Sequence, residues 1–179
     1  MSAWRHAVAI VLLPGTVTIV VPAVILVSGE AAAAGFGESA AVEALTVTAG
    51  AALIVAGAAL WVWTVRLFAR IGRGTLAPWD PTRRLVVAGP YRHVRNPMIT
   101  GVLAILLGEG LALGSTGILV WAAAFLAINT IYFVASEEPG LERRFGAEYR
   151  DYKTNVPRWL PRRTPWNPGT GNEQGSDPL

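Results

Sequence analysis

The sequence predicts an all-α integral membrane protein with about four transmembrane helices, the last two in a tight hairpin, and a cytosolic amphipathic helix near the C-terminus. Three observations predict this fold class. Of the 179 residues, 53% are hydrophobic and only 15% are charged, whereas a soluble domain carries about 25% charged residues. The apolar residues form long uncharged runs, and the basic residues cluster outside these runs.

Four runs are the candidate spans. Three of them are uncharged and long enough, at about 1.5 Å per residue, to cross a hydrocarbon core of roughly 30 Å. They are residues 7–27, 44–65 and 116–135. Residues 98–113 are shorter and contain Glu109, but they are too apolar for a surface loop. Because only Gly114 and Ser115 separate this run from the last one, the two are predicted to form a tight helical hairpin.

The first run has an alternative interpretation as a signal peptide. Arg5 and His6 form a weak basic start, and residues 31–34 resemble a small-residue cleavage site. The apolar stretch is longer than the roughly 7–15 residues of a signal core, which favours a retained span. Pro14 and Pro22 are expected to kink it, and neighbouring helices can accommodate such kinks.

The distribution of basic residues predicts the orientation. Lys and Arg occur at position 5, between positions 66 and 95, and between positions 143 and 163. The loop between the first two runs contains no basic residue and carries Glu30, Glu38 and Glu43. The positive-inside rule then predicts four spans with both termini cytosolic. The expected location of this multi-pass protein is the bacterial inner membrane. The net charge of +3 is explained by anionic lipid headgroups and needs no nucleic acid.

The connecting segments predict where the helices begin and end. The second span is expected to continue past the bilayer through Arg66 and Arg70, until a Gly- and Pro-rich stretch at residues 72–81 breaks it. A short extended piece at residues 85–87 follows. Pro97 suits the first position of the third span, because that position needs no backbone N–H. These features predict one membrane domain over residues 1–163.

The chain after the fourth span is predicted to change direction. Pro139 disfavours helix at Glu138, so the span should end or bend there. Four apolar or aromatic residues then recur at helical spacing with charges between them, which predicts one amphipathic helix at the interface or over the site. They are Leu141, Phe145, Tyr149 and Tyr152. Residues 164–179, rich in Gly, Pro and Asn, are expected to be disordered.

Two polar clusters flank the predicted hairpin. Residues 91–97 lead into a helix N-terminus, whose free N–H groups and dipole favour an anion, and Arg95 adds donors suited to a carboxylate. Glu137 and Glu138 form the second cluster, and adjacent carboxylates at a membrane helix end are costly unless paired or solvated. They suit a ligand's ammonium, sulfonium or ribose hydroxyls. Folding the hairpin brings both clusters together on the cytosolic side, which predicts a polar cofactor pocket.

Simpler interpretations remain open for each cluster. Arg92 and Arg95 would contact only lipid headgroups, and the two glutamates would be solvated or paired with Arg143 and Arg144. Outside these clusters, Glu109 is a functional candidate because it is ionisable within a span, although its position nearer the outer end favours interfacial exposure. Asn129 suits interhelical hydrogen bonding as well as a pocket.

The remaining patterns favour packing. The tryptophans at positions 61, 63, 121, 159 and 166 suit interfacial belts or packing. Gly108-Glu109-Gly110 lies within a span and follows no strand, so it is not a dinucleotide fingerprint. Small residues suit close contact between helices: Gly50, Ala52, Ala56, Gly57, Gly101, Ala104 and Gly108. The absence of cysteine excludes thiolate sites, and His6 and His93 alone argue against a buried metal centre.

Two motifs in this order and spacing carry a family resemblance. They read Gly89-Pro90-Tyr91, Arg95-Asn96-Pro97 and Gly101, followed by Glu137-Glu138, Leu141, Phe145-Gly146, Tyr149, Tyr152 and Val156-Pro157-Arg158. This pattern resembles the isoprenylcysteine carboxyl methyltransferase and phospholipid methyltransferase superfamily. The resemblance covers residues 85–163 and implies a membrane methyltransferase that uses S-adenosylmethionine.

The resemblance also implies residue roles. The cofactor-binding residues would be Tyr91, Arg95, Asn96, Glu137 and Glu138. Arg144 and Arg158 would act in catalysis by orienting cofactor or substrate near the membrane opening. The lipophilic substrate would enter from the bilayer and the cofactor from the cytosol.

The chain departs from the family pattern at two positions. The family often has His at the position of Asn96 and an aromatic residue at Ile99. Because Asn cannot act as a base, the methyl acceptor stays open among a prenylated thiol, a phospholipid amine and a small lipophilic metabolite. Two other functions also stay open, a membrane reductase using NADPH and a non-enzymatic membrane module.

Overall fold

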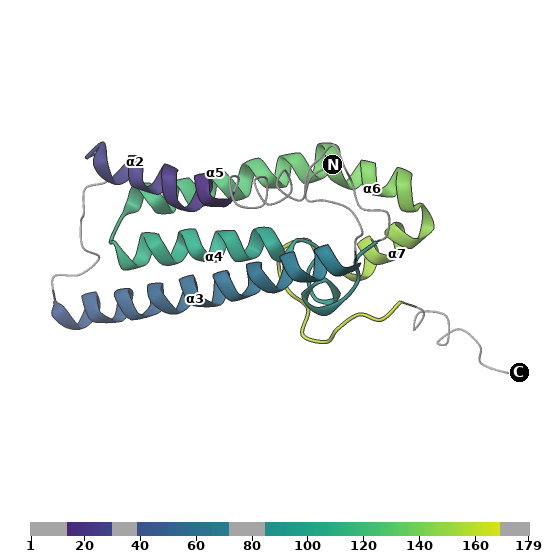
Figure 1. Cartoon of the computed structure of the whole chain (residues 1–179), viewed down its shortest axis with the longest axis horizontal. Helices are drawn as coiled ribbons and strands as arrows, with labels where there is room; N and C mark the ends of the chain where they lie inside the picture. The colour runs from purple at the N-terminus through teal and green to yellow at the C-terminus, as the bar shows by residue number, and fades with distance from the viewer. Residues whose placement is uncertain (1–13, 30–38, 72–84, 169–179) are drawn as a thin grey trace, which may run out of the picture.

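The computed structural model describes residues 14–29, 39–71 and 85–168, and within these residues every regular element is a helix. The predicted all-α class is therefore confirmed. In chain order the elements are η1 (Thr16–Val20), α2 (Val21–Val27), α3 (Ala40–Ile71), η2 (Gly89–Arg92), α4 (Pro97–Ala112), α5 (Thr116–Tyr132), η3 (Phe133–Glu137), α6 (Glu138–Phe145) and α7 (Ala147–Asn155). Figure 1 shows α3, α4 and α5 side by side, with α6, α7 and the C-terminal segment gathered at one end.

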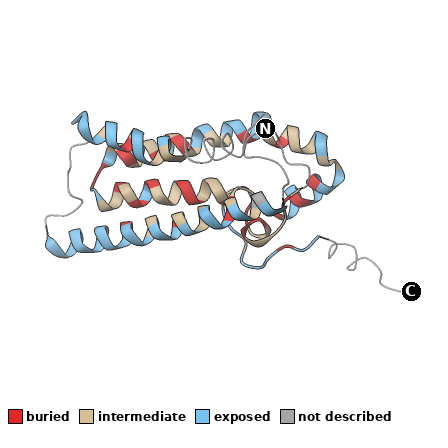
Figure 2. Ribbon diagram, in the orientation of Figure 1, coloured by how far each residue is buried: buried red, intermediate tan, exposed pale blue. Residues whose placement is uncertain are grey.

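Two helical stretches are long and apolar enough to cross a membrane. They are Ala40–Leu67 and Thr116–Phe145, with mean hydropathies of 2.0 and 2.1. Only 11% and 22% of their most apolar windows are buried, so most of these apolar side chains face outward, as Figure 2 shows for α3. An outward apolar surface suits lipid, whereas the core helix of a soluble protein is buried. Thr16–Val27 and Pro97–Ala112 are shorter apolar helices, and residues 7–13 of the first predicted span lie outside the described residues.

Glycines set the close approach of α3 and α4. A Cβ atom at Gly50 would lie 2.6 Å from the carbonyl oxygen of Gly108, and one at Gly57 would lie 2.6 Å from that of Gly101. Any larger residue would therefore push the two backbones apart. The small-residue contact predicted from the sequence is confirmed at these four positions. It fixes α4 against α3 and so places the segment that leads into α4.

The predicted hairpin of α4 and α5 is also confirmed. Gly114 has φ +60° in the turn, a conformation that glycine adopts without steric cost. The Ser115 hydroxyl then caps α5 by accepting the N–H of Ile118 at 3.3 Å. Side chains from both helices meet in one core: Val102 and Leu106 with Ala122 and Phe125. The N-terminal helix joins this core because the indole of Trp121 donates to the Val17 carbonyl at 3.1 Å.

The chain does not leave the helical path at Glu138, contrary to one reading of Pro139. A proline has no N–H and its ring clashes with the carbonyl four residues earlier. The π-helical turn η3 lies directly before the proline and widens the helix at that point. Pro139 then occupies the first turn of α6, where it is tolerated. Glu137 and Glu138 consequently sit within a continuous helical stretch.

The segment after Pro139 contains two short helices where one amphipathic helix was expected. Gly146 separates α6 from α7 with φ +55°, which turns the chain back toward the start of α4. The aromatic face of α7 packs in a second core made of Tyr149, Tyr152, Val156 and Trp166. Trp166 is only 8% exposed, so ordered packing extends past Thr164, where the sequence suggested a disordered tail. Residues 169–179 lie outside the described residues.

Candidate functional site

The two polar clusters meet at Glu138. Its carboxylate oxygen Oε1 accepts the Arg158 Nε–H at 2.6 Å and lies 2.9 Å from the Arg95 terminal nitrogen NH1. Lys153 Nζ approaches the other oxygen at 3.5 Å. The Glu138 side chain is 5% exposed and that of Arg95 is 10% exposed. The sequence-based prediction that folding the hairpin brings these clusters together is confirmed by this contact.

Arg95 is held from several sides. Its backbone N–H donates to the Pro157 carbonyl at 2.9 Å, and its NH1 donates to the Tyr149 hydroxyl at 3.5 Å. Its Nε–H is buried and has no hydrogen-bond partner. A buried guanidinium donor without a partner is costly. Among the described residues, no acceptor satisfies this donor of Arg95.

The C-terminal segment is hydrogen-bonded to the loop that carries Arg95. The Tyr152 hydroxyl donates to the Tyr91 carbonyl at 2.7 Å. Arg92 and Trp166 exchange two hydrogen bonds of 2.9 Å, one from the Arg92 side chain and one from the Trp166 backbone. The Arg162 N–H donates to the His93 carbonyl at 3.0 Å. These bonds join segments about 60 to 75 residues apart in the sequence, so the C-terminal segment helps to hold the loop in position.

Two further predicted residues, Tyr91 and Arg144, interact electrostatically with Glu137. Burial raises the pKa of Tyr91 well above its usual 10, and the negative charge of Glu137 raises it further. Arg144 acts electrostatically on the same carboxylate, and its guanidinium lies 5.7 Å from the centre of the Phe145 ring. The tyrosine remains protonated at neutral pH, so its hydroxyl is neutral and does not act as a base.

Asn96 lies at the start of α4, where its side chain makes no capping hydrogen bond. Its carbonyl accepts both the N–H and the hydroxyl of Thr100 at 3.0 Å. The amide side chain is thus not committed to capping the helix, which leaves it available to a ligand. All seven predicted site residues consequently belong to the same end of the helical bundle, on the loop before α4, on η3 and α6, and on the C-terminal segment.

Sequence reasoning gave no site role to Tyr149, Tyr152 and Lys153. The first two were part of the family motif and of the predicted amphipathic helix, without a role in the site, but their hydroxyls contact Arg95 and the Tyr91 backbone. Burial raises the pKa of both phenols above the usual value. Lys153 gave no distinguishing signal, because a lysine on an amphipathic helix normally points to solvent.

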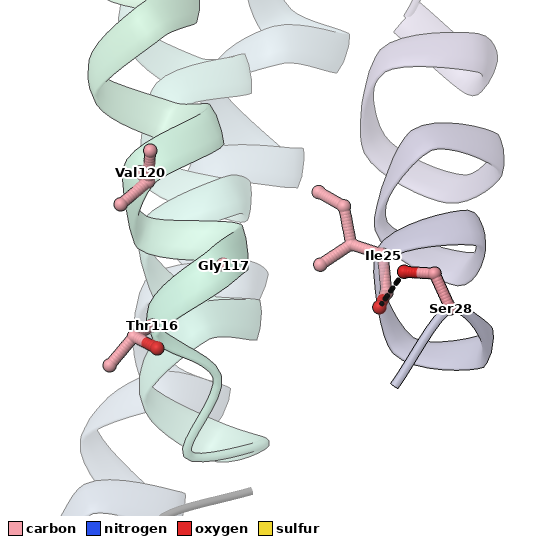
Figure 3. Close-up of a pocket in the computed structure, with 5 residues that line it drawn as sticks. All are labelled: Ile25, Ser28, Thr116, Gly117 and Val120. Atoms are coloured by element: carbon pink, nitrogen blue, oxygen red, sulfur yellow. Dashed lines mark hydrogen bonds between the residues drawn. The ribbon is translucent and has the colours of Figure 1, made fainter. Parts of the chain in front are cut away.

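The other polar residues weighed from the sequence lie away from this cluster. Asn129 donates from its side-chain amide to the Phe125 carbonyl of its own helix at 2.8 Å, so this hydrogen bond does not join two helices. Glu109 is half-buried in α4, and its oxygen Oε2 is buried without a hydrogen-bond partner. Among the described residues, a hollow between α2 and α5 is lined by uncharged residues that include Ile25, Ser28 and Thr116. Figure 3 shows that the Ser28 hydroxyl turns back to the Ile25 carbonyl of its own helix.

The sequence pattern of the family described as phospholipid methyltransferase matches residues 45–148. An uncharacterized protein of Haemophilus influenzae is 43% identical over 65 residues, which are 35% of this chain and 100% of that relative. No solved structure matches the chain. The family match runs from α3 into α7 and includes the residues at which the loop and the two glutamates meet.

Proposed function

Because the chain belongs to the phospholipid methyltransferase family, we propose that it is a membrane methyltransferase that moves a methyl group from S-adenosylmethionine to a lipophilic acceptor. The observation that carries the proposal is the contact of Arg95 with Glu138. It joins the two motifs of the family resemblance into one buried polar site beside apolar helices that suit a bilayer.

The residues present fit this cofactor. S-adenosylmethionine presents a carboxylate, an ammonium, a sulfonium and ribose hydroxyls. The unpartnered Nε–H of Arg95 suits the carboxylate. Glu137 suits the ammonium or the ribose, and it interacts electrostatically with Tyr91, whose neutral hydroxyl is a further hydrogen-bond partner for the cofactor. The amide of Asn96 lies next to Arg95 in the sequence and makes no capping bond.

The two glutamates take different roles in this proposal. Glu138 already has Arg95 and Arg158 on one oxygen and Lys153 on the other. It therefore holds Arg95 and the C-terminal segment in position. Glu137 has no comparable set of ion pairs among the described residues, so it is the carboxylate that contacts the cofactor. Arg144 and Arg158 orient the cofactor or the acceptor from α6 and the C-terminal segment.

The bound cofactor would supply a methyl group on a positively charged sulfur, which is already activated for transfer. The protein's task is to hold the acceptor in line at about 3 Å and to exclude water. Tyr91, Tyr149 and Tyr152 stay protonated at neutral pH and do not take a proton from the acceptor. A lipophilic acceptor reaches the site sideways from the bilayer, and the cofactor arrives from the cytosol, where both termini lie.

Calorimetric binding to the detergent-purified protein tests the proposal. The titrants are S-adenosylmethionine, its demethylated product and NADPH. We expect micromolar affinity for the first two, an affinity for them at least tenfold weaker in Glu137→Gln, and unchanged affinity in the control Glu142→Gln, whose carboxylate is 36% exposed. Binding of NADPH alone would indicate a reductase. Folded protein that binds none of the three would indicate a module without this activity.

A further inference from the structure

An apolar groove lies outside the predicted cofactor site. It has a volume of about 410 Å³, within the range of roughly 300–1,000 Å³ usual for ligand sites. Leu60 and Trp63 of α3 form one wall, and Pro161 and Pro165 of the C-terminal segment form another. The loop before α4 contributes its lining in between, including Val94. The groove therefore exists only where α3, the loop and the tail meet.

The loop presents opposite faces to the groove and to the cofactor site. Arg95 contacts Glu138 and Tyr149 on the inner face, whereas Arg92 and Val94 line the groove. A molecule in the groove would thus contact the loop before α4 on the side away from Arg95. It would not occupy the position proposed for the cofactor.

The groove is bordered by Arg92, for which the described part of the chain provides no carboxylate partner. Residues 85–97 and 156–168 contain several arginines and no acidic residue. Arg95 and Arg158 pair with Glu138. Arg92 lines the groove, and among the described residues its side chain donates to two neutral oxygens, the Trp166 carbonyl and the Asn167 side chain. An anionic group is therefore the natural partner of the groove's rim.

The apolar wall points to a lipid rather than to a free anion. Trp63 is 55% exposed on a helix apolar enough to cross a membrane. It lies close before Arg66, and this order of tryptophan then arginine is typical of the membrane interface. At that depth a phospholipid presents an acyl chain to the apolar wall and a phosphate to the basic rim.

We propose that this groove binds one phospholipid with an anionic headgroup, its acyl chain against Leu60 and Trp63 and its phosphate near Arg92. The bound lipid braces the loop against the C-terminal segment and so stabilises the position of Arg95. This proposal rests on the chain lying in a membrane and is independent of the methyl-transfer chemistry.

Native mass spectrometry of the full chain in detergent tests it, with phosphatidylglycerol and phosphatidylcholine as probes. Leu60→Trp fills the groove, and Val62→Trp is the matched control, because Val62 is exposed on the same helix and does not line the groove. We expect the wild type to prefer phosphatidylglycerol, Leu60→Trp to bind it at least tenfold more weakly, and Val62→Trp to bind normally. The thermal stabilisation that this lipid gives should disappear in Leu60→Trp alone.

Two further experiments distinguish the contribution of the phosphate group from that of the acyl chain. Arg92→Gln keeps a donor for the Trp166 carbonyl, and it should remove the preference for the anionic lipid. Inorganic phosphate should not displace the lipid, because the acyl chain contributes to binding. Equal binding of phosphatidylglycerol by the two tryptophan variants, or displacement by phosphate, would overturn the proposal. If Leu60→Trp does not fold, Thr100→Phe fills the groove from α4 and is judged by the same outcomes.

Discussion

Arg95 and Glu138 form an ion pair of 2.9 Å between side chains that are 10% and 5% exposed. One residue precedes the α4–α5 hairpin and the other follows it, so the pair closes the hairpin at its polar end. A charge pair removed from water is not a reliable source of stability. Its value here is positional, because it fixes a guanidinium that still has one unsatisfied donor.

Replacing Glu138 should destabilise the protein as well as weaken cofactor binding. Glu138→Gln leaves Arg95 buried without its counter-ion, and breaking a buried pair in this way costs about 3–5 kcal/mol. Lys153 adds little, because its side chain is 40% exposed and solvent screens it. Thermal unfolding in detergent should show a clear fall in Tm for this variant.

Glu142→Gln is the matched control for that variant. Its carboxylate lies 4.0 Å from Arg150 and 3.8 Å from Lys153 but is 36% exposed. Exposed ion pairs contribute about 0–1 kcal/mol, so its Tm should stay near that of the wild type. Equal losses of Tm in the two variants would show that burial of Glu138 does not determine the effect.

Gly57→Ala should destabilise the contact of α3 with α4. The added methyl group would lie 2.6 Å from the Gly101 carbonyl oxygen, and overpacking of this kind costs about 1–3 kcal/mol. Gly140→Ala is the control, because nothing lies within 4 Å of the added methyl group on α6. There the replacement should be neutral or stabilising, since alanine is the better helix former. A Tm for Gly57→Ala at or above that of Gly140→Ala would contradict the packing described.

The sequence predicted those parts of the fold that depend on local patterns of residues. The apolar runs at residues 44–65 and 116–135, the turn at Gly114 and the small residues of α3 and α4 each predicted their outcome correctly, because each depends on near neighbours or on one helix contact. The four-span topology stays a prediction, because the other two apolar helices are shorter. The continuation through Pro139 and the division at Gly146 were missed. Both depend on backbone geometry, a π turn and a positive φ, that no periodicity of side chains records.

The candidate site, too, was predicted from the sequence only in part. The residue types and their two-cluster arrangement were readable from the sequence, and the meeting of Arg95 with Glu138 followed from the hairpin. The full set of residues that pair with Glu138 could not be predicted from the sequence. Glu138 was expected either to bind a ligand or to pair with Arg143 and Arg144, whereas besides Arg95 its partners are Arg158 and Lys153 on the returning chain. Such contacts depend on how the C-terminal segment packs, which local sequence does not specify.

Tyr152→Phe should loosen the loop without changing its charge. The variant removes the donor of the 2.7 Å hydrogen bond to the Tyr91 carbonyl, and a buried acceptor left unsatisfied costs about 1–3 kcal/mol. Backbone hydrogen exchange around Tyr91 should therefore accelerate and Tm should fall. Tyr132→Phe is the control, because that ring is 44% exposed. Unchanged exchange in Tyr152→Phe would show that the tail does not restrain the loop through this bond.

Asn96→Ala separates a binding role from a structural one. Asn96 stands at the N-cap of α4, but its side chain makes no capping hydrogen bond, so its removal should change stability by no more than about 0.5 kcal/mol. Ser115→Ala is the contrasting variant, because that side chain is 1% exposed and caps α5; its loss should cost about 1 kcal/mol. In calorimetry with S-adenosylmethionine we expect the opposite order, with affinity reduced in Asn96→Ala and retained in Ser115→Ala. Full affinity in Asn96→Ala at unchanged Tm would remove Asn96 from the proposed cofactor site and leave Arg95 and Glu137 as its contacts.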